Sequence, residues 1–485
     1  MPRLPTSQAF VVVVFLGVFT LASRSATDPD MWWHLRTGQY ILEHRAVPHS
    51  DPFSYTRRGE KWVAHEWLSE ISMYEIQHIA GWAGLIVSFA AIVCGAFYLL
   101  YLRCGPYRYV AGIAALFGAW ATQMVWGVRP QVISLLLTSL WLLILEKSDQ
   151  RPKLLWWTLP LTLLWVNLHA GFALGLALFG LFIAGELVER WLGHSRQHPN
   201  WFRTAAFIFL LDLCIVPLNP NGAQMYVYPI ETLRSAAMQS YIVEWASPNF
   251  HRAEYWPFLL IALAVIVVLA WSPSRVGVRE LLLLIISFYA ALCAIRMIPL
   301  FVLIAVPIVA HRLGGLLPNH SLPARKAGSR TAVNVAILLA MAAFTGIHVL
   351  GVIEKQAQAE TQRFPAAAVQ YLQAHAQPGP IFNLYDWGGY LIWKLSPSVP
   401  VFVDGRADLY GEKFLNEYAA TIDLKDEWKN TLQRWRVGTV LIRPDSPLAQ
   451  ELRSEPGWTV VHEDTVAIIF VAANGTQPPE VGRLP

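Results

Sequence analysis

The sequence predicts an α-helical membrane protein with about eleven spans, followed by a small C-terminal α/β domain. Hydrophobic residues make up 55% of the 485-residue chain, and charged residues make up only 14%. A soluble globular protein carries about 25% charged residues, so neither a soluble nor a disordered chain is expected. Apolar stretches recur as far as residue 351. The net charge of +4 is too small to indicate nucleic acid binding.

The spans are predicted from apolar stretches, because a transmembrane helix needs roughly 20 such residues. A polar break at 167–171 separates two of them, since asparagine and histidine side chains are costly against lipid. The first stretch is expected to be an uncleaved span rather than a signal peptide. The eleven predicted spans are 8–23, 82–102, 108–126, 130–146, 154–168, 170–190, 204–218, 256–271, 279–295, 297–313 and 331–351.

Basic residues in the connecting segments predict the orientation, because lysine and arginine concentrate in cytoplasmic loops. With the N-terminus inside, the inside segments carry 15 basic residues, whereas the longer outside segments before residue 354 carry 10. We therefore expect a cytoplasmic N-terminus. After eleven spans the C-terminal domain then lies outside.

The domain boundary is predicted where the composition changes, near Gly351. Residues 1–353 form the predicted transmembrane domain, with a first outer loop at 24–66, and residues 354–485 form a soluble α/β domain. Within the latter, 364–376 has a helical pattern. Short buried strands are expected at 380–384, 399–403, 439–442 and 466–471.

The first outer loop carries the densest polar pattern. Asp28 precedes Pro29, which is typical of a helix start with a capping carboxylate. Asp30 lies four residues before His34, so the two share a helical face and could form an acid/base pair. Alternatively, Asp30 only favours the helix dipole and His34 is solvated. The neighbouring Trp32 and Trp33 are expected to anchor the loop at the membrane surface.

A second polar pair, His65-Glu66, enters the next helix. With Ser69 and Glu70 one turn on, it gives a polar stripe that faces either water or a cleft. A metal site could be imagined from His34, His49, His65 and Glu66. Their spacing matches no recognised ligand pattern. We therefore expect no metal and no cofactor.

These motifs resemble bacterial members of the C-type (GT-C) glycosyltransferase superfamily, in the family 39 and protein-O-mannosyltransferase-like subgroup. The resemblance rests on Asp-Pro-Asp-Met-Trp-Trp-His-Leu-Arg-Thr-Gly from Asp28, on Trp-Val-Ala-His-Glu-Trp-Leu from Trp62, and on later motifs that include Trp165-Val-Asn-Leu-His-Ala-Gly. It covers most of the chain. The known relatives carry adjacent or differently spaced acidic residues, whereas this chain has Asp-Pro-Asp.

The resemblance implies a GT-C-like fold in a bacterial inner (plasma) membrane. It implies transfer of a sugar from a polyprenyl-phosphate carrier in the bilayer to a glycan, lipid or protein acceptor on the outer face. An acidic residue of the first outer loop acts as base in such enzymes. Asp30 and Asp28 are the candidates here, and the resemblance leaves open which of them serves.

The leaving phosphate would need cationic partners, and arginine suits phosphate well. Arg129 and Arg296 lie in apolar surroundings at predicted outer ends of spans, where an unpaired charge is costly. Each therefore either binds the phosphate or forms a structural ion pair with Asp30, Glu66 or Glu244. Asn167 and His169, together with His34, His65 and Glu66, are further candidates for substrate binding. One-step transfer would invert the anomeric centre without a metal.

The competing hypothesis is a transporter or flippase for a lipid-linked or small polar solute, which the span number fits equally well. Against it, the polar residues gather at one predicted surface, and no inverted repeat is evident. An O-antigen ligase or polymerase and a non-enzymatic assembly protein are weaker alternatives.

In the C-terminal domain, Gly388-Gly389 indicates a turn or a close backbone approach. Asp404-Gly405-Arg406 indicates either a structural ion pair or a site for acceptor recognition.

Overall fold

The computed structural model describes residues 4–195, 197–198, 200–272, 276–316, 331–376, 378–425 and 428–473, the side chain at 237 apart. The chain forms two compact units. The helical unit comprises Met1–Arg24, Ala83–Pro229 and Ile242–Glu354, and the mixed unit comprises Ser25–Trp82, Ile230–Tyr241 and Lys355–Pro485. The compact units change after Glu354, and the division into a transmembrane and a soluble domain near that point stays a prediction. The first outer loop, however, belongs to the mixed unit rather than to the helical one.

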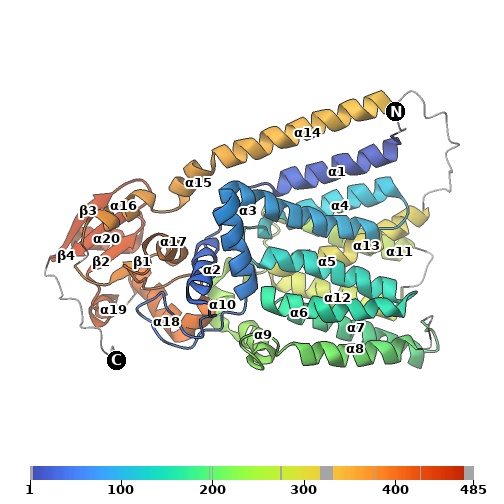
Figure 1. Cartoon of the computed structure of the whole chain (residues 1–485), viewed down its shortest axis with the longest axis horizontal. Coiled ribbons are helices and arrows are strands. Elements are labelled where there is room, and N and C mark those ends of the chain that lie inside the picture. The colour runs from blue at the N-terminus through green and yellow to red at the C-terminus, as the bar shows by residue number, and fades with distance from the viewer. Residues whose placement is uncertain are drawn as a thin grey trace. The chain divides into compact units, whose positions relative to one another are not determined.

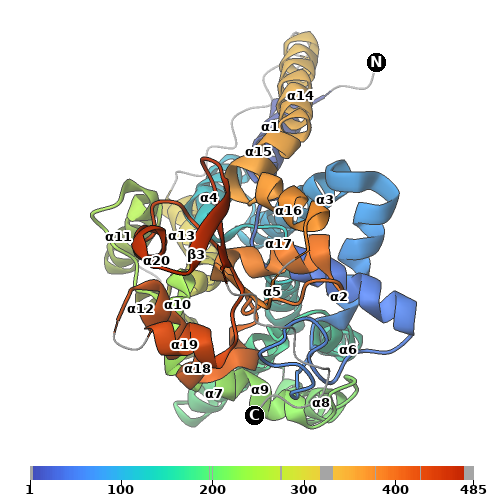
Figure 2. The ribbon, with the colours of Figure 1, turned by 90° about the vertical axis from the view of Figure 1, so that its left-hand side faces the viewer.

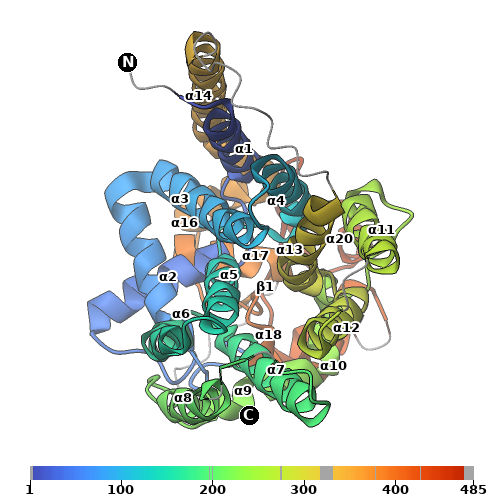
Figure 3. The same ribbon diagram turned by 90° about the vertical axis from the view of Figure 1, so that its right-hand side faces the viewer.

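Apolar helices that run side by side build the helical unit (Figure 1), and Figure 3 shows them nearly end-on. Short 3-10 turns extend several of them. The helices are α1 (Thr6–Ala22), the part of α3 (Trp67–Arg103) beyond Gly81, α4 (Arg108–Thr122), α5 (Gln131–Ser148), α6 (Thr158–Leu168), α7 (Phe172–Trp191), α8 (Trp201–Ile215), α11 (Trp256–Trp271), α12 (Val278–Cys293), α13 (Ile298–Leu316) and α14 (Thr331–Glu354). α9 (Gln224–Arg234) begins in this unit.

Each of the eleven predicted spans overlaps one of these helices. The polar break is confirmed, since α6 ends at Leu168 and α7 begins at Phe172. Within the described residues, six helices are long and apolar enough to cross a membrane: Trp67–Arg103, Gln131–Ser148, Phe172–Trp191, Ala253–Trp271, Ile295–Gly315 and Thr331–Glu354. The larger number of eleven spans stays a prediction.

Ion pairs join the basic residues that we place on the cytoplasmic side to acidic residues of neighbouring helices. Arg103 binds Glu146 with an N–O distance of 2.6 Å, and Arg312 binds Glu280 at 2.7 Å. Arg279 forms a third such pair with Asp149. These contacts bring one set of helix ends together, as an alternating path through the bundle requires. Which set faces the cytoplasm stays a prediction.

The mixed unit combines a four-stranded sheet with short helices. The sheet order is β1 (Ile381–Asn383), β2 (Thr439–Ile442), β4 (Ile468–Ala472) and β3 (Trp458–Glu463); β1 and β2 are parallel, and the other pairs are antiparallel. The helices of this unit are α2 (Met31–His44), the start of α3, α10 (Ala236–Tyr241), α15 (Gln356–Arg363), α16 (Ala366–Ala374), α17 (Tyr385–Leu395), α18 (Ala407–Ile422), α19 (Trp428–Arg434) and α20 (Pro447–Ser454). Figure 2 shows α18 beside α19.

The expected helix at 364–376 is confirmed as α16, and three of the four expected strands are confirmed as β1, β2 and β4. The strand expected at 399–403 is wrong. There, Val401 forms a single parallel bridge with Ser54 of the first outer loop. Val401, Phe402 and Val403 are buried, and Phe402 packs against rings of both the loop and the C-terminal segment, which explains the strand-like pattern. β3 escaped prediction because it is an edge strand in which every side chain is exposed or half-buried.

A buried ion-pair network joins the first outer loop to the C-terminal segment. The guanidinium of Arg406 lies 2.7 Å from an oxygen of Asp51 and 2.7 Å from one of Asp404, and all three side chains are buried. The Tyr410 hydroxyl donates to Asp404 over 2.6 Å. The ring planes of Trp62 and Phe53 cover the guanidinium, at 4.6 and 5.3 Å from their centroids. The Asp-Gly-Arg motif is therefore a structural pair, which holds the loop as well as its own domain.

We expect the replacement Arg406→Met to destabilise the mixed unit by about 3–5 kcal/mol, because it leaves the buried carboxylates of Asp51 and Asp404 without their cationic partner. Thermal unfolding followed by tryptophan fluorescence, and protease resistance of the purified chain, would measure the loss. Arg434→Met is the matched control, since the Arg434–Glu417 pair is exposed and is expected to contribute at most about 1 kcal/mol. Equal effects of the two replacements would contradict the structural role of Arg406.

Candidate active site

The Asp-Pro-Asp motif forms the turn that starts α2. An Oδ1 atom of Asp28 accepts a hydrogen bond from the amide of Asp30 over 3.0 Å. Asp28 therefore stabilises the turn before the helix. The expected helix start at Pro29 with Asp28 as its cap is wrong, because α2 begins at Met31 and its N-cap residue is Asp30. Asp30 is the residue that precedes the helix, and its side chain is half-buried.

The Asp30 carboxylate lies against residues of the C-terminal segment. Its Oδ1 accepts a hydrogen bond from Trp33 Nε1 over 3.3 Å, and it lies so close to Gly405 that a Cβ atom there would overlap it. The Tyr385 hydroxyl donates to the Gly405 carbonyl over 3.1 Å. Burial, and then the charge of Asp30, raises the pKa of the Tyr385 hydroxyl well above its usual range. Tyr385 is therefore a neutral hydrogen-bond donor beside the acidic residue.

Aromatic packing holds this turn in place. Trp32 is fully buried among Trp82, Phe364 and Tyr390, with ring centroids 4.9–5.3 Å apart. Trp33 is also buried. The expectation that both tryptophans anchor the loop at a membrane surface is wrong, because they form core contacts with α17 instead. The expected close approach at Gly388-Gly389 is confirmed, since this part of α17 lies against backbone carbonyls.

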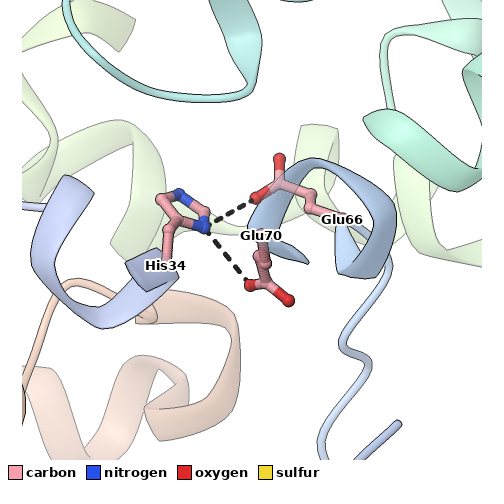
Figure 4. Close-up of side chains that lie close together, drawn as sticks. All are labelled: His34, Glu66 and Glu70. Carbon is pink, nitrogen blue, oxygen red and sulfur yellow. Dashed lines mark hydrogen bonds and ion pairs between the residues drawn. The ribbon is translucent and has the colours of Figure 1, made fainter. Parts of the chain in front are cut away.

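His34 lies one turn along α2 from Asp30, but its Nδ1 atom faces two glutamates. It is 3.2 Å from Glu70 Oε1 and 3.5 Å from Glu66 Oε2, and all three side chains are buried (Figure 4). We call these three residues the His34 cluster. The alternative of a solvated His34 is therefore wrong, and its described contacts differ from the acid/base pair expected with Asp30.

His65 supports the His34 cluster from the loop before α3. Its Nε2 lies 3.4 Å from Glu66 Oε1, and its Nδ1 lies 3.1 Å from the carbonyl oxygen of Val63. Burial favours the neutral ring, but the charge and hydrogen bond of Glu66 outweigh it and raise the pKa of His65. Glu66 therefore stabilises the positively charged form of His65 relative to a free histidine.

In the helical unit, Arg129 and Arg296 converge near the start of α5. Arg129 forms an ion pair with Glu244. The Arg296 guanidinium lies 4.6 Å from the ring centroid of the adjacent Trp245, and its Nη2 is 3.5 Å from Gln131 Oε1. Both arginines are half-buried. Two alternatives were open for Arg129, phosphate binding or a structural ion pair, and the structure shows the ion pair. Arg296 instead contacts the side-chain amide of Gln131 and the aromatic face of Trp245.

His169 lies beside the same helix. Its Nδ1 is 2.8 Å from the Ser134 hydroxyl and accepts a hydrogen bond from the Gly171 amide over 2.9 Å. Asn167 points elsewhere, because its Nδ2 donates to the carbonyl oxygens of Leu163 and Leu218. Three of the candidates in the helical unit thus lie around the first turn of α5, namely Arg129, Arg296 and His169. The fourth, Asn167, forms hydrogen bonds that stabilise the end of α6.

Sequence reasoning missed several residues of these sites. Glu70 was visible only as part of a polar stripe, although its spacing of four residues from Glu66 places both on one face of α3. No local pattern connects Gly405 and Tyr385 with Asp30, because the contacts join segments more than 350 residues apart. Gln131 also escaped notice.

Comparisons with known proteins identify the fold. No protein-family model matches the sequence, and no curated protein matches it. Among solved structures, the arabinofuranosyltransferase AftD from Mycobacteria matches 97% of this chain with a TM-score of 0.56 and 14% identity, and this chain covers 42% of AftD. ArnT from Cupriavidus metallidurans, bound to undecaprenyl phosphate, matches 97% with a TM-score of 0.51 and 14% identity, and 98% of ArnT is covered.

A third solved structure is the archaeal oligosaccharyltransferase AglB from Archaeoglobus fulgidus, in complex with an inhibitory peptide and a dolichol-phosphate. It matches 97% of this chain with a TM-score of 0.57 and 11% identity, and 74% of AglB is covered. These three enzymes are GT-C glycosyltransferases. The chain therefore has the GT-C fold that its motifs predict, and the likeness does not single out the family 39 subgroup.

Proposed function

We propose that this chain is a membrane glycosyltransferase that moves a sugar from a polyprenyl-phosphate donor to an acceptor on the outer face of the membrane. The observation that carries the proposal is a fold shared over 97% of the chain with solved glycosyltransferases, of which ArnT holds undecaprenyl phosphate and AglB holds a dolichol-phosphate. A bacterial plasma membrane, eleven crossings, a cytoplasmic N-terminus and an outer C-terminal domain belong to the same proposal.

Asp30 is the proposed catalytic base. Its side chain is half-buried, and its carboxylate lies beside Trp33 Nε1 and Gly405. Asp28 is less suited, because its Oδ1 accepts the Asp30 amide and so shapes the turn. In the proposed step, Asp30 removes the proton from an acceptor hydroxyl, whose oxygen attacks the anomeric carbon.

The bond between the anomeric carbon and the phosphate oxygen breaks in the same step. Its electron pair leaves with the lipid phosphate, and the anomeric configuration inverts. Arg296 is the proposed phosphate ligand, with Arg129 and His169 beside it, because guanidinium groups bind phosphate oxygens well and the start of α5 favours an anion. His34, His65, Glu66 and Asn167 have structural contacts that do not require a direct role toward the substrate. The expectation that transfer needs no metal stays a prediction.

Replacement Asp30→Asn is expected to lower transfer by about 10²–10⁴-fold, the usual contribution of a positioned base. The assay would use purified protein and a sugar linked to polyprenyl phosphate. Asp28→Asn is the matched comparison. It keeps the oxygen that accepts the Asp30 amide, so transfer should change little. The opposite order of the two effects would assign the base to Asp28, and undiminished turnover in both would remove the motif from catalysis.

Replacement Gly405→Ala is expected to lower the transfer rate by about 100-fold, because the new Cβ must displace the Asp30 carboxylate by an ångström or more. Thermal unfolding would be recorded on the same sample, to separate misplacement of Asp30 from loss of the fold. Gly346→Ala is the control, since its added Cβ meets no atom within 4 Å. Full activity of the Gly405 variant would contradict the position assigned to Asp30.

Replacement Arg296→Ala is expected to weaken donor binding by about 10–150-fold, the equivalent of one lost hydrogen bond to a charged group. Equilibrium binding of a polyprenyl-phosphate sugar to the detergent-solubilised chain would measure it. Arg252→Ala provides the control, because Arg252 is an exposed arginine of the same unit that pairs with Glu254. An unchanged dissociation constant for the Arg296 variant would contradict the assignment.

A further inference from the structure

We propose that the His34 cluster binds one divalent transition-metal ion between α2 and α3. The inference does not rest on the proposed function, because it follows from the three buried side chains alone. His34 offers an imidazole nitrogen, and Glu66 and Glu70 each offer a carboxylate oxygen; these donor atoms all lie within 4.8 Å of one another. The three side chains come from two helices and converge in Figure 4.

The separations match those that a small metal ion imposes on its ligands. Zinc binds nitrogen and oxygen donors at about 2.0–2.2 Å, so two donors of one tetrahedral site lie roughly 3.4 Å apart. The observed distances from His34 Nδ1 are 3.2 Å to Glu70 and 3.5 Å to Glu66. An ion could therefore enter with small shifts of the side chains.

The helices that carry the ligands are held rigidly together. Gly38 lies one turn beyond His34 on α2, and a Cβ atom there would overlap the backbone carbonyl of Glu70. This close approach brings the face with His34 against the face with Glu66 and Glu70. Donors on rigid elements are pre-organised, which is the condition for a tight metal site.

A second observation points to a missing cation. Glu70 is 1% exposed, and its Oε2 atom has no hydrogen-bond partner among the described residues. An unsatisfied carboxylate oxygen in the interior is costly. A metal ion bound by both oxygens of Glu70, or by one with a water on the other, would remove that cost.

The two glutamates of the cluster face each other across one histidine nitrogen. Oxygens of Glu70 and Glu66 lie 3.2 and 3.5 Å from His34 Nδ1. A divalent cation bound between the two buried carboxylates would offset their mutual repulsion. The donor set of one imidazole and two carboxylates suits Zn²⁺ or Mn²⁺ better than Ca²⁺ or Mg²⁺, which prefer oxygen ligands alone.

The bound ion would link α2 to the start of α3, one helical turn from Asp30. It would therefore also hold the turn before α2 in place. His65 would act on the ion through Glu66, since it faces the other oxygen of that carboxylate.

The test uses the full chain in detergent, stripped of metal with a chelator and titrated with Zn²⁺ or Mn²⁺ in a calorimeter. We expect one ion per chain and a higher midpoint of thermal unfolding once it is bound. Replacement Glu70→Gln should weaken binding by at least about 100-fold and abolish the shift of the midpoint. Two exposed positions supply controls on the same loop, Glu43→Gln and His49→Asn, and both variants should bind as the wild type does.

A proton in place of a metal is the outcome that would overturn the proposal. In that case the wild type would bind no stoichiometric ion, or Glu70→Gln would leave binding unchanged. If Glu70→Gln fails to fold, electron spin-echo spectra of the Mn²⁺-loaded wild type decide the matter. Coupling to one imidazole nitrogen is expected, and its absence would refute a His34 ligand.

Discussion

The buried guanidinium of Arg406 is the interaction on which the mixed unit depends. Burying an unpaired charge is costly, so Arg406 must keep Asp51 of the loop and Asp404 of the C-terminal segment within 2.7 Å. This fixes the backbone between Asp404 and Arg406, where Gly405 lies against the Asp30 carboxylate. The segment far along the chain thus sets the position of the acidic residue near its beginning. The first outer loop and the C-terminal segment therefore fold together, although they are far apart in the sequence.

Much of the fold could be predicted from composition and periodicity. Helices lie at all eleven predicted spans, and β2 was placed to the residue, because apolar runs of these lengths have few other folded states. The failures have physical causes. Residues 401–403 are apolar because they pack in the core of the mixed unit, not because they pair in the sheet. β3 lacks a buried face. Trp32 and Trp33 look like surface anchors until the aromatic partners from the C-terminal segment are known.

The sequence predicted most of the residues of the candidate site, but it did not predict which of their side chains contact one another. Asp30, His34, His65 and Glu66 stand out as a polar group in an apolar chain, but local spacing joined Asp30 to His34. The structure turns His34 toward Glu66 and Glu70 instead, because α2 and α3 meet at Gly38. Arg129 likewise finds its partner in Glu244, 115 residues away. Pairings of this kind depend on tertiary contacts, which a single sequence does not display.

The proposed activity is cleavage of the bond between a sugar and its polyprenyl phosphate. It is measured most directly by reconstituting the wild-type protein in liposomes with a polyprenyl-phosphate sugar labelled in the sugar, and by following both products. We expect free polyprenyl phosphate and an equal amount of glycosylated acceptor with inverted anomeric configuration. Movement of the intact sugar lipid across the bilayer, without cleavage, would contradict it and identify the chain as a transporter.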